Sequence, residues 1–407
     1  MKIVILAYHF PVRSETFIVQ HALGLARRGH KVTVIADGLG PGLDTSELSI
    51  LSSQGVNHVF CKEPSKSRFL RYIQLVWWLF CYPRQIQKLM RKTAWGVTEL
   101  YRAWQEMNSI QYLQPDVVHV HYGLKAGALA EFENLQPFVV TWHGFDANVI
   151  PRTRGEAMYS GLFEKSWTHT VGSEYMWQRL LQLGAASTQL RKMPMGVDIN
   201  KFDYEKRHLA SSSPFKIISV GRLDEMKGHQ YLIEAVHRMK ERGGDVELRI
   251  IGEGPLRPKI EAQIESLECK GYVKLLGAQS SERVLVELQK ADCFALTGVE
   301  AQNGRVETQG VVFIEAQSVG LPVIACNVGG VAESLIDGET GVLCEPRNVE
   351  QIVEALMFYK KSAKTRQEYG AAGRMFVEEK FSIEKMLTSF EGLYLKVLNS
   401  KTEGGQG

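Results

Sequence analysis

The sequence has no excess of charge of one sign, no paired cysteines and no long apolar run. Its 407 residues include 48 Lys and Arg against 45 Asp and Glu, and the net charge of +3 is too small to indicate nucleic-acid binding. The six cysteines are scattered without a Cys-x-x-Cys pair, which argues against both a zinc knuckle and a disulfide framework. We therefore expect reduced cysteines and a cytoplasmic location.

Neither a secretory signal nor a membrane span is expected from the hydropathy pattern. The apolar run at residues 3–7 is short and leads into Tyr-His-Phe-Pro without a small-residue cleavage site. The most apolar stretch, residues 75–82, is far below the roughly 18 residues that a spanning helix needs. We expect a protein that can lie on the inner face of a membrane without crossing it.

The order of apolar runs indicates an α/β fold. With 44% hydrophobic and 23% charged residues, the chain has the composition of a globular protein with a sizeable core. Apolar runs at 3–7 and 32–36 enclose a helical pattern that stops at Gly29, and this βαβ opening is typical of a parallel sheet. The pattern fades over residues 200–215 and starts again at 216, which predicts two doubly wound domains joined by a linker. Ligands of such folds bind at the carboxyl ends of strands.

Two loops that follow expected strands have the chemistry of a phosphate site. Residues 221–228 read Gly-Arg-Leu-Asp-Glu-Met-Lys-Gly and present Arg222 and Lys227, which suit a diphosphate, although a solvated turn has the same composition. Residues 252–255 read Gly-Glu-Gly-Pro, which allows backbone to approach a flat ring, but an ordinary strand-to-helix turn is the simpler explanation of this loop alone. The loop is not a Gly-x-Gly-x-x-Gly fingerprint, so a dinucleotide site is not supported.

The strongest pattern is a pair of glutamates around an expected helix start. Glu307 lies on a loop and Glu315 in the following helix, with seven residues between them and Gly310 near the helix start. Free N–H groups and the positive end of the helix dipole favour a phosphate there. Carboxylates accept several hydrogen bonds from hydroxyl groups. The pattern fits a nucleotide sugar, with one carboxylate on the sugar and one on the ribose; a helix-terminal charge plus a surface glutamate is the alternative.

Residues 307–330 resemble the nucleotide-sugar signature of family 4 glycosyltransferases. That family has the GT-B architecture of two facing Rossmann-like domains with an interdomain cleft. The loops at 221–228 and 252–255, and Pro-Met-Gly-Val-Asp at 194–198, match the family in the same order. The resemblance covers nearly the whole chain and is specific in combination. Residues 11–16 and the loop at 297–305 look most like exopolysaccharide glycosyltransferases of the colanic-acid and amylovoran type.

The resemblance implies a division into domains and a set of site residues. Residues 1–200 would form the acceptor-side domain, 201–385 the nucleotide-sugar domain, and 386–407 a helix that packs back toward the first domain, with a flexible tail. Arg222 and Lys227 would bind the donor diphosphate, Glu307 the transferred sugar and Glu315 the ribose. The implied catalytic residues are His143, Glu307, Arg222 and Lys227, and the donor-binding residues are Gly221, Arg222, Lys227, Glu253, Gly254, Glu307, Gly310, Val311 and Glu315.

Three other features are open to more than one explanation. His143 matches the active-site histidine of the family, but a packed histidine at a strand end is the alternative. His119 and His121 alternate on one expected strand without an evident third metal ligand, so we expect packing rather than a metal site. Arg152 and Arg154 form a basic loop that suits an acceptor or simply faces solvent.

One loop departs from the family. Many members carry Gly-Gly after the first strand, close to the donor phosphates, whereas residues 11–16 here read Pro-Val-Arg-Ser-Glu-Thr. The Ser14 side chain is expected either to cap the following helix or to replace this backbone contact.

The sequence and the resemblance together predict a retaining glycosyltransferase that moves a sugar from a nucleoside-diphosphate sugar to a polysaccharide precursor, which the family implies is lipid-linked. No Asp-x-Asp occurs in the chain, so we expect transfer without a metal or other cofactor. A GT-B epimerase or phosphorylase, or a non-catalytic subunit of a polysaccharide assembly complex, stays open. An epimerase would act on the donor without an acceptor, and a phosphorylase would use orthophosphate.

Residues 62–92 have the most unusual composition in the chain. They contain eight basic residues against one acidic residue, interleaved with aromatic side chains at helical spacing. Such a helix suits the surface of an anionic bilayer, where each cation contributes about 1 kcal/mol. An ordinary helix whose aromatic side chains pack into the first domain is the alternative.

Overall fold

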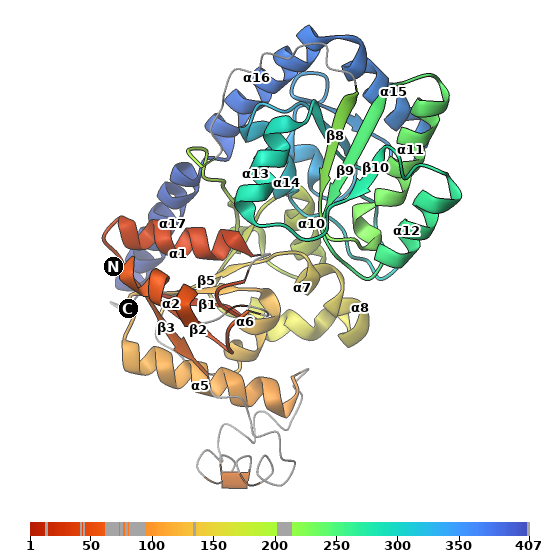
Figure 1. Ribbon diagram of the computed structural model, residues 1–407. Helices are drawn as coiled ribbons and strands as arrows, with labels where there is room; N and C mark the ends of the chain where they lie inside the picture. Colours follow the sequence, from red (N-terminus) through yellow and green to blue (C-terminus); the bar gives the residue numbers. More distant parts are fainter. Residues whose placement is uncertain are drawn as a thin grey trace. The chain divides into compact units, whose positions relative to one another are not determined.

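The computed structural model describes residues 1–12, 15–40, 43, 45–61, 95–132, 136–201 and 214–404, together with Ile73, Val76, Trp77 and Phe80. These residues form two compact units, each built on a parallel sheet (Figure 1). The N-terminal unit contains Met1–Gly172, Met176–Met193 and Met386–Gly407, and the C-terminal unit contains Ser173–Tyr175 and Pro194–Lys385. The predictions for Ser14 and for most of residues 62–92 lie outside the described residues.

The N-terminal unit has a seven-stranded sheet in the order β3-β2-β1-β4-β5-β6-β7. Its strands are β1 (Lys2–Leu6), β2 (Lys31–Ala36), β3 (Val56–Phe60), β4 (Val117–His121), β5 (Phe138–Thr141), β6 (Thr168–Val171) and β7 (Leu190–Lys192). Its helices are α1 (Thr16–Arg27), α2 (Thr45–Ser53), α5 (Val97–Leu113), α6 (Gly123–Ala130), α7 (Phe145–Asn148), α8 (Ile150–Arg154), α9 (Ser160–Phe163) and α10 (Glu174–Gln182), with 3₁₀ turns η1 (Glu156–Tyr159) and η2 (Ser187–Gln189). The order of the strands reverses between β1 and β4, as in the Rossmann fold.

The C-terminal unit repeats this topology with a six-stranded sheet in the order β10-β9-β8-β11-β12-β13. Its strands are β8 (Phe215–Val220), β9 (Val246–Ile251), β10 (Val273–Leu275), β11 (Cys293–Leu296), β12 (Val323–Cys326) and β13 (Gly341–Cys344). Its helices are α11 (His229–Glu241), α12 (Arg257–Ser266), α13 (Ser281–Lys290), α14 (Val311–Ser318), α15 (Val349–Lys361) and α16 (Ala363–Lys380), with 3₁₀ turns η3 (Glu225–Lys227) and η4 (Val331–Ser334). The prediction of an α/β fold with two Rossmann-like sheets is confirmed.

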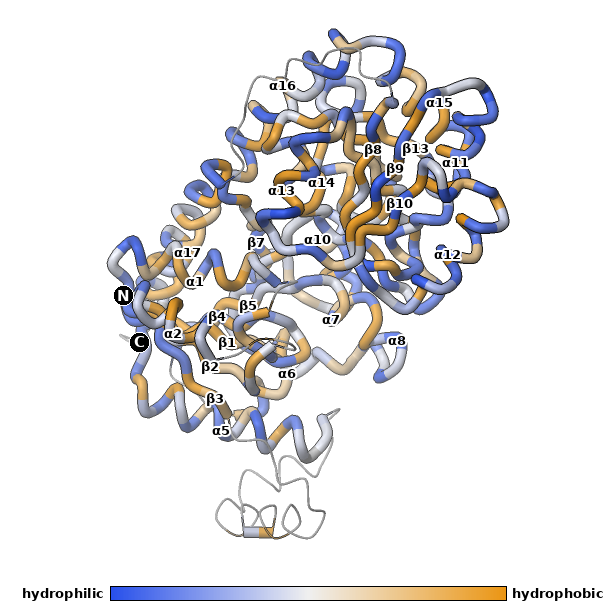
Figure 2. Tube along the Cα trace, in the orientation of Figure 1, coloured by the Kyte–Doolittle hydropathy of each residue, from blue (hydrophilic) through white to orange (hydrophobic). Residues whose placement is uncertain are grey.

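The strands β11 and β12 are buried at every position, which explains why they are continuous apolar runs. Hydrophobic residues concentrate in the strands of this unit (Figure 2). Side chains that alternate along each strand enter two separate cores. Ile217 faces a core that includes α11, α12 and α15, whereas Ile218 faces a core that includes α13 and α14. The strands are therefore fixed in register, and the loops at their carboxyl ends are held in defined positions.

The last helix, α17 (Ile383–Gly404), belongs to the N-terminal unit from Met386 onward. Glu391 accepts a hydrogen bond from Arg28 at 2.6 Å and pairs with His30 at 2.7 Å. The Tyr394 hydroxyl lies 2.6 Å from Nδ1 of His119. A side chain on Gly24 would collide with Leu387, so the glycine allows the close approach of α1 to α17.

The boundary between the units differs from the one expected at residue 200. Residues 194–200 belong to the C-terminal unit, because Met195 exchanges two hydrogen bonds with the Gln309 side chain at 2.9 and 2.8 Å. Val197 is bonded to Phe381 and Ile383 through its backbone. These contacts are made between residues distant in sequence, which is why a composition shift did not locate them.

Candidate functional site

The loops that follow β8 and β9 are joined at the carboxyl edge of the second sheet. The Leu223 N–H donates to the carbonyl of Glu253 at 3.0 Å, and the Leu256 N–H donates to the carbonyl of Leu223 at 2.9 Å. A Cβ on Gly252 would lie 2.0 Å from the carbonyl oxygen of Gly221, so only glycine permits this contact. The two glycine-containing loops singled out in the sequence are therefore one structural feature.

Lys227 and Glu307 meet in an ion pair at the point where the strand order reverses. Lys227 follows β8 and Glu307 follows β11, the two strands that flank this switch point. The side chains are 15% and 19% exposed, so the pair is partly shielded from water. Ligands of open α/β sheets bind at this position. The structure thus brings together a cation and a carboxylate that the sequence placed eighty residues apart.

The charge of Glu307 is stabilised by its surroundings. Burial alone would raise its pKa, but Lys227 and the backbone N–H groups of Gly310 and Thr308 outweigh burial and lower the pKa. Gly310 precedes α14 with a positive φ of 76°, which turns these N–H groups toward the carboxylate. Glu307 is therefore an ionised acceptor at neutral pH, as a contact to sugar hydroxyl groups requires.

The loop after β12 closes on Glu307 from another side. The Gly330 N–H donates to the carbonyl of Glu307 at 2.9 Å, and a Cβ on Gly329 would lie 2.0 Å from the same oxygen. A small pocket beside the ion pair is lined by residues that include Met226, Gly298 and Phe313. The paired glycines at the end of the recognised signature thus permit close packing of backbone around the carboxylate.

Arg222 occupies a different environment from Lys227. Its side chain is 60% exposed, and its Nε lies 3.7 Å from Asp224, whose carboxylate also pairs with Arg305 at 3.2 Å. No contact with Lys227 or Glu307 is present among the described side chains. Arg222 is therefore a solvent-accessible cation on the same loop. It is held in an ion-pair network with Asp224 and Arg305, which the sequence analysis did not identify.

The remaining donor-binding predictions lie on this loop system or on α14. Glu253 is half exposed and pairs with Arg257 at 2.5 Å, and a Cβ on Gly254 would lie 2.4 Å from the carbonyl oxygen of Leu223. Val311 begins α14 and packs partly into a small apolar cluster. Burial raises the pKa of Glu315 to about 7, and Lys201 offsets part of this rise. A ligand hydroxyl bonded to Glu315 would favour its ionised form.

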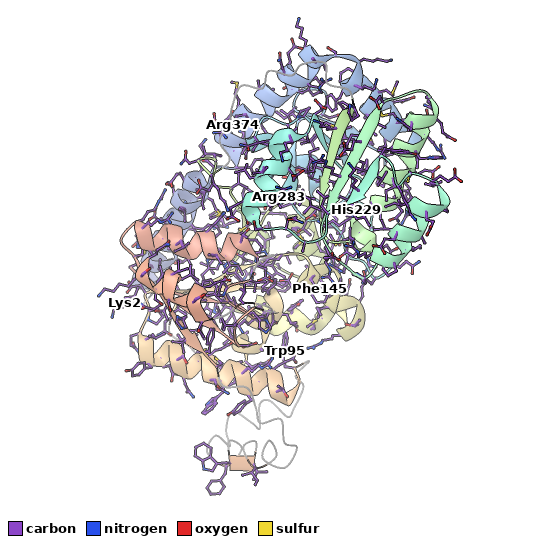
Figure 3. The ribbon with its side chains drawn as sticks, in the orientation of Figure 1. Lys2, Trp95, Phe145, His229, Arg283 and Arg374 are labelled. Atoms are coloured by element: carbon purple, nitrogen blue, oxygen red, sulfur yellow. The ribbon has the colours of Figure 1, made fainter. Side chains whose placement is uncertain are left out.

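His229 was missed by the sequence reading although it directly follows Gly228. It begins α11 and is labelled in Figure 3. The side chain is 1% exposed, and neither ring nitrogen has a hydrogen-bond partner among the described residues. Burial and the nearby Lys227 charge lower its pKa to about 3, so it is neutral. The only sequence signal was a polar residue at the buried start of an amphipathic helix.

The predicted active-site histidine lies in the N-terminal unit, after β5. Asp146 holds the loop that carries His143 by accepting backbone hydrogen bonds from Gly123 at 2.6 Å, Gly144 at 2.9 Å and His143 at 3.3 Å. Burial raises the pKa of Asp146 to about 6, although these three bonds act against it. Phe145, which lies between Gly144 and Asp146 in the chain and is labelled in Figure 3, is 52% exposed according to its solvent-accessible surface. The motif His-Gly-Phe-Asp is therefore a fixed turn.

His143 itself is partly buried between aromatic rings. Its ring lies 4.8 Å from Phe17 and 4.7 Å from Tyr122, centroid to centroid, and its Nε2 lies 2.9 Å from Nδ1 of His121. Burial lowers the pKa of His143 to about 3, so the imidazole is neutral at physiological pH. All of these contacts lie within the N-terminal unit.

Side-chain contacts bear on the predictions for the basic loop at Arg154 and for the histidines of β4. Arg154 donates two hydrogen bonds to Glu99 at 3.1 and 2.8 Å, so this guanidinium already has a carboxylate partner in its own unit. His119 and His121 lie on β4 and meet a third histidine, His21 of α1, which the sequence did not place beside them.

Lys125 forms a buried charge network that sequence reasoning also missed. Its ammonium lies 2.5 Å from Glu106 and 3.2 Å from Asp37, and all three side chains are at most 5% exposed. Arg102 adds a second cation 3.6 Å from Asp37, and the ammonium lies 4.8 Å from the ring centre of Tyr8. Burial by itself would lower the pKa of Lys125, but Glu106 and Asp37 outweigh it and raise the pKa.

Comparison with known proteins places this geometry in a class. The family model described as Glycosyltransferase Family 4 matches residues 14–201, and the model described as Glycosyl transferases group 1 matches residues 200–376. The crystal structure of Anabaena Alr3699/HepE in complex with UDP-glucose superposes with a TM-score of 0.73 over 98% of this chain and 100% of that chain, at 16% identity. The two Rossmann-like units are those of a GT-B glycosyltransferase.

Two curated relatives extend the match over most of the sequence. The putative colanic acid biosynthesis glycosyltransferase WcaL of Salmonella typhimurium is 27% identical over 374 residues, which cover 87% of this chain and 89% of the relative. The amylovoran biosynthesis glycosyltransferase AmsK of Erwinia amylovora is 26% identical over 398 residues, covering 94% and 96%. The chain belongs to glycosyltransferase family 4, as the resemblance in the sequence indicated.

Proposed function

We propose that the protein is a retaining glycosyltransferase that moves a hexosyl group from a nucleoside-diphosphate sugar to a lipid-linked exopolysaccharide precursor. The observation that carries this proposal is the Lys227–Glu307 pair at the switch point of the C-terminal sheet. The UDP-glucose complex of the structural neighbour supports the donor class, and the names of WcaL and AmsK support the exopolysaccharide setting.

The residues present suit the charge that develops when the bond to the diphosphate breaks. The leaving group gains negative charge, which Lys227, Arg222 and the N–H groups at the start of α14 would stabilise. Glu307 is ionised and would accept hydrogen bonds from the sugar, and Glu315 would accept them from the ribose. Because protein cations serve the diphosphate, we propose that transfer needs no metal ion.

A nucleotide-sugar screen by thermal shift tests the donor assignment. A donor that binds only the folded chain stabilises it by about 2.7 kcal/mol at one hundred times its Kd, so one or a few nucleoside-diphosphate sugars should raise the Tm. Free hexoses and nucleoside monophosphates should not. Glu315→Ala should abolish the shift, whereas Glu265→Ala, which removes an exposed carboxylate paired with Lys270, should leave it intact. Absence of any shift across the common nucleotide sugars would remove the basis of the proposal.

We also propose that residues 62–92 attach the enzyme to an anionic membrane surface, where a lipid-linked acceptor would be found. Four apolar residues of this segment are helical, and their spacing places them on one helix face: Ile73, Val76, Trp77 and Phe80. Their side chains are 46%, 44%, 63% and 85% exposed, respectively. The basic residues around them supply attraction to anionic lipid. Among the described residues no helix combines the length and hydrophobicity that would let it cross a bilayer.

Liposome co-sedimentation tests this attachment. The chain should pellet with vesicles that contain anionic lipid, and high salt should release it because the attraction is screened. Trp77→Ser with Phe80→Ser should reduce the bound fraction several-fold, whereas Tyr112→Ser, which removes an equally exposed aromatic ring on α5, should not. Equal recovery in the supernatant with anionic and neutral vesicles at low salt would refute peripheral attachment.

A further inference from the structure

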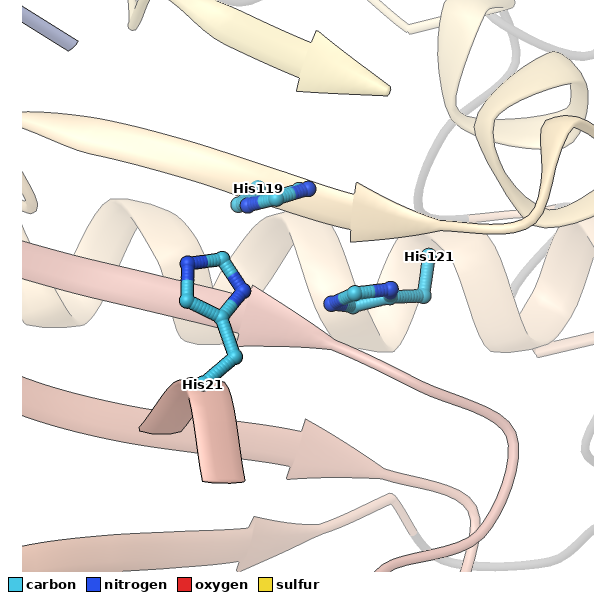
Figure 4. A group of neighbouring side chains, drawn as sticks. All are labelled: His21, His119 and His121. Carbon is cyan, nitrogen blue, oxygen red and sulfur yellow. The ribbon is translucent and has the colours of Figure 1, made fainter. Parts of the chain in front are cut away.

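Three fully buried histidines lie together, and one of them contacts His143. His21 comes from α1, and His119 and His121 come from β4; each is 0% exposed (Figure 4). His119 and His121 lie with ring centres 4.6 Å apart, and His21 lies 5.1 Å from His119. Burying so many polar rings is costly unless their nitrogens are hydrogen-bonded. The pattern of these bonds therefore determines what the cluster does.

Three neighbouring histidines can bind a metal ion, but the hydrogen bonds of His119 argue against a metal site here. Its Nδ1 lies 2.6 Å from the Tyr394 hydroxyl and its Nε2 lies 2.6 Å from the Thr141 hydroxyl. Both ring nitrogens are thus engaged, which leaves only His21 and His121 with an unbonded nitrogen. Zinc sites in proteins use three or four protein ligands. We therefore consider the cluster as a hydrogen-bond network.

The position of the proton on His119 can be assigned from the carbonyl of Val140, which is the last hydrogen-bond acceptor of the network. Thr170 donates to the carbonyl of Val140 at 3.5 Å, so its oxygen accepts from the Thr141 hydroxyl 2.5 Å away. The Thr141 oxygen then accepts from His119. His119 therefore carries its proton on Nε2, and its Nδ1 accepts.

The hydroxyl of Tyr394, in the C-terminal helix α17, connects His119 to His21. The Tyr394 hydroxyl donates to Nδ1 of His119, and its oxygen accepts from Nε2 of His21 at 3.3 Å. His21 is then left with an unbonded lone pair on Nδ1 and with no unbonded N–H group. Desolvation lowers the pKa of His21 to about 3, which agrees with a neutral ring.

The tautomer of His121 determines which nitrogen of His143 carries the proton, because the two rings are hydrogen-bonded to each other. The Nε2 of His121 has no hydrogen-bond partner, and a buried lone pair is less costly there than a buried unpaired N–H group. Its proton is therefore on Nδ1, which lies 2.9 Å from Nε2 of His143. The planes of the two rings are inclined by 16°, and their centroids are 5.2 Å apart. This separation is about the sum of the 2.9 Å contact and the distances from each ring centre to its nitrogen, so the two nitrogens point at each other.

We propose that His121 is a positioning residue that fixes the tautomer of His143. By donating to Nε2 it places the His143 proton on Nδ1, so that His143 offers an N–H donor and not a general base. A donor of this kind can bond to a sugar hydroxyl or a phosphate oxygen as the donor substrate reacts. The catalytic consequence rests on the proposed function; the tautomer assignment does not.

Two measurements separate the two parts of this inference. With ¹⁵N-histidine in the full chain, and His143→Asn to identify the signals, His143 should show a protonated Nδ1 and an unprotonated Nε2. His121→Phe should shift the proton of His143 to Nε2 or give a mixture, whereas His121→Asn, whose amide can donate from nearly the same place, should restore the wild-type pattern. A wild-type His143 protonated on Nε2, or an unchanged pattern in His121→Phe, would overturn the assignment.

Kinetics then test the catalytic consequence. His121→Phe should lower kcat at least about tenfold with little change in the donor KM, because a misplaced group affects the reaction more than binding. His121→Asn should recover most of this loss. His169→Phe removes an equally buried histidine on β6 and should lower Tm without changing the His143 signals. Wild-type kcat in His121→Phe, with the tautomer changed, would show that His143 has no part in transfer while leaving the assignment intact.

Discussion

Lys227→Ala is expected to reduce sugar transfer by about 100-fold or more. Removing one preorganised electrostatic group from an active site has an effect of this size, and Lys227 is the partly buried cation at the switch point of the C-terminal sheet. The substitution also leaves Glu307 without its ion-pair partner, so the carboxylate becomes harder to keep ionised. Arg222→Ala, which removes the exposed cation of the same loop, is expected to have an effect of similar size. Steady-state kinetics with the identified donor measure both.

The control for this prediction is Lys274→Ala. Lys274 lies in the same unit on the edge strand β10, is about half exposed and pairs with Glu247 at 3.2 Å. Its loss should leave transfer within about twofold of wild type, since exposed ion pairs contribute little. Near wild-type transfer by both Lys227→Ala and Arg222→Ala would show that the diphosphate assignment is wrong.

Lys125→Met should lower the free energy of unfolding by about 3–5 kcal/mol. The substitution leaves Glu106 buried without its cation and Asp37 with only the more distant Arg102, and breaking a buried charge network by removing one partner has this cost. Chemical denaturation of the N-terminal unit, followed by the fluorescence of its tryptophans, gives the measurement. Glu106→Gln added to Lys125→Met should recover part of the loss, because it removes one of the uncompensated charges.

Arg154→Met is the matched control in the same unit. Its ion pair with Glu99 is about one-third exposed on both sides, so its loss should cost less than about 1 kcal/mol. If Lys125→Met were no more destabilising than Arg154→Met, the network around Lys125 would not be the buried structural element that its geometry indicates.

Much of the fold followed from local patterns in the sequence. Apolar runs located strands to within a residue or two: the run at residues 32–36 corresponds to β2, Lys31–Ala36. The helical pattern that was expected to stop at Gly29 is α1, which ends two residues earlier at Arg27 and has Arg28 as its C-cap. The fold class followed because continuous apolar strands with intervening helices require a sheet covered on both faces.

The site was only partly accessible in this way. Lys227 and Glu307 could be named because each belongs to a loop after a strand, and such loops meet at one edge of a parallel sheet. Lys125 could not, because a lysine in a short helix has the same local pattern whether it is exposed or surrounded by Glu106 and Asp37. The bond between His119 and Tyr394 joins residues 275 positions apart, a distance over which hydropathy identifies a buried face but not the partner.

The most direct test of the proposed activity is to follow transfer from an identified nucleoside-diphosphate sugar to a lipid-linked acceptor in the presence of EDTA, with the anomeric configuration of the new bond read by NMR. We expect product to form at an undiminished rate, with the configuration of the donor sugar retained and with loss of the product in Lys227→Ala. An inverted anomeric centre, or activity that EDTA abolishes and magnesium or manganese restores, would contradict a retaining, metal-independent glycosyltransferase.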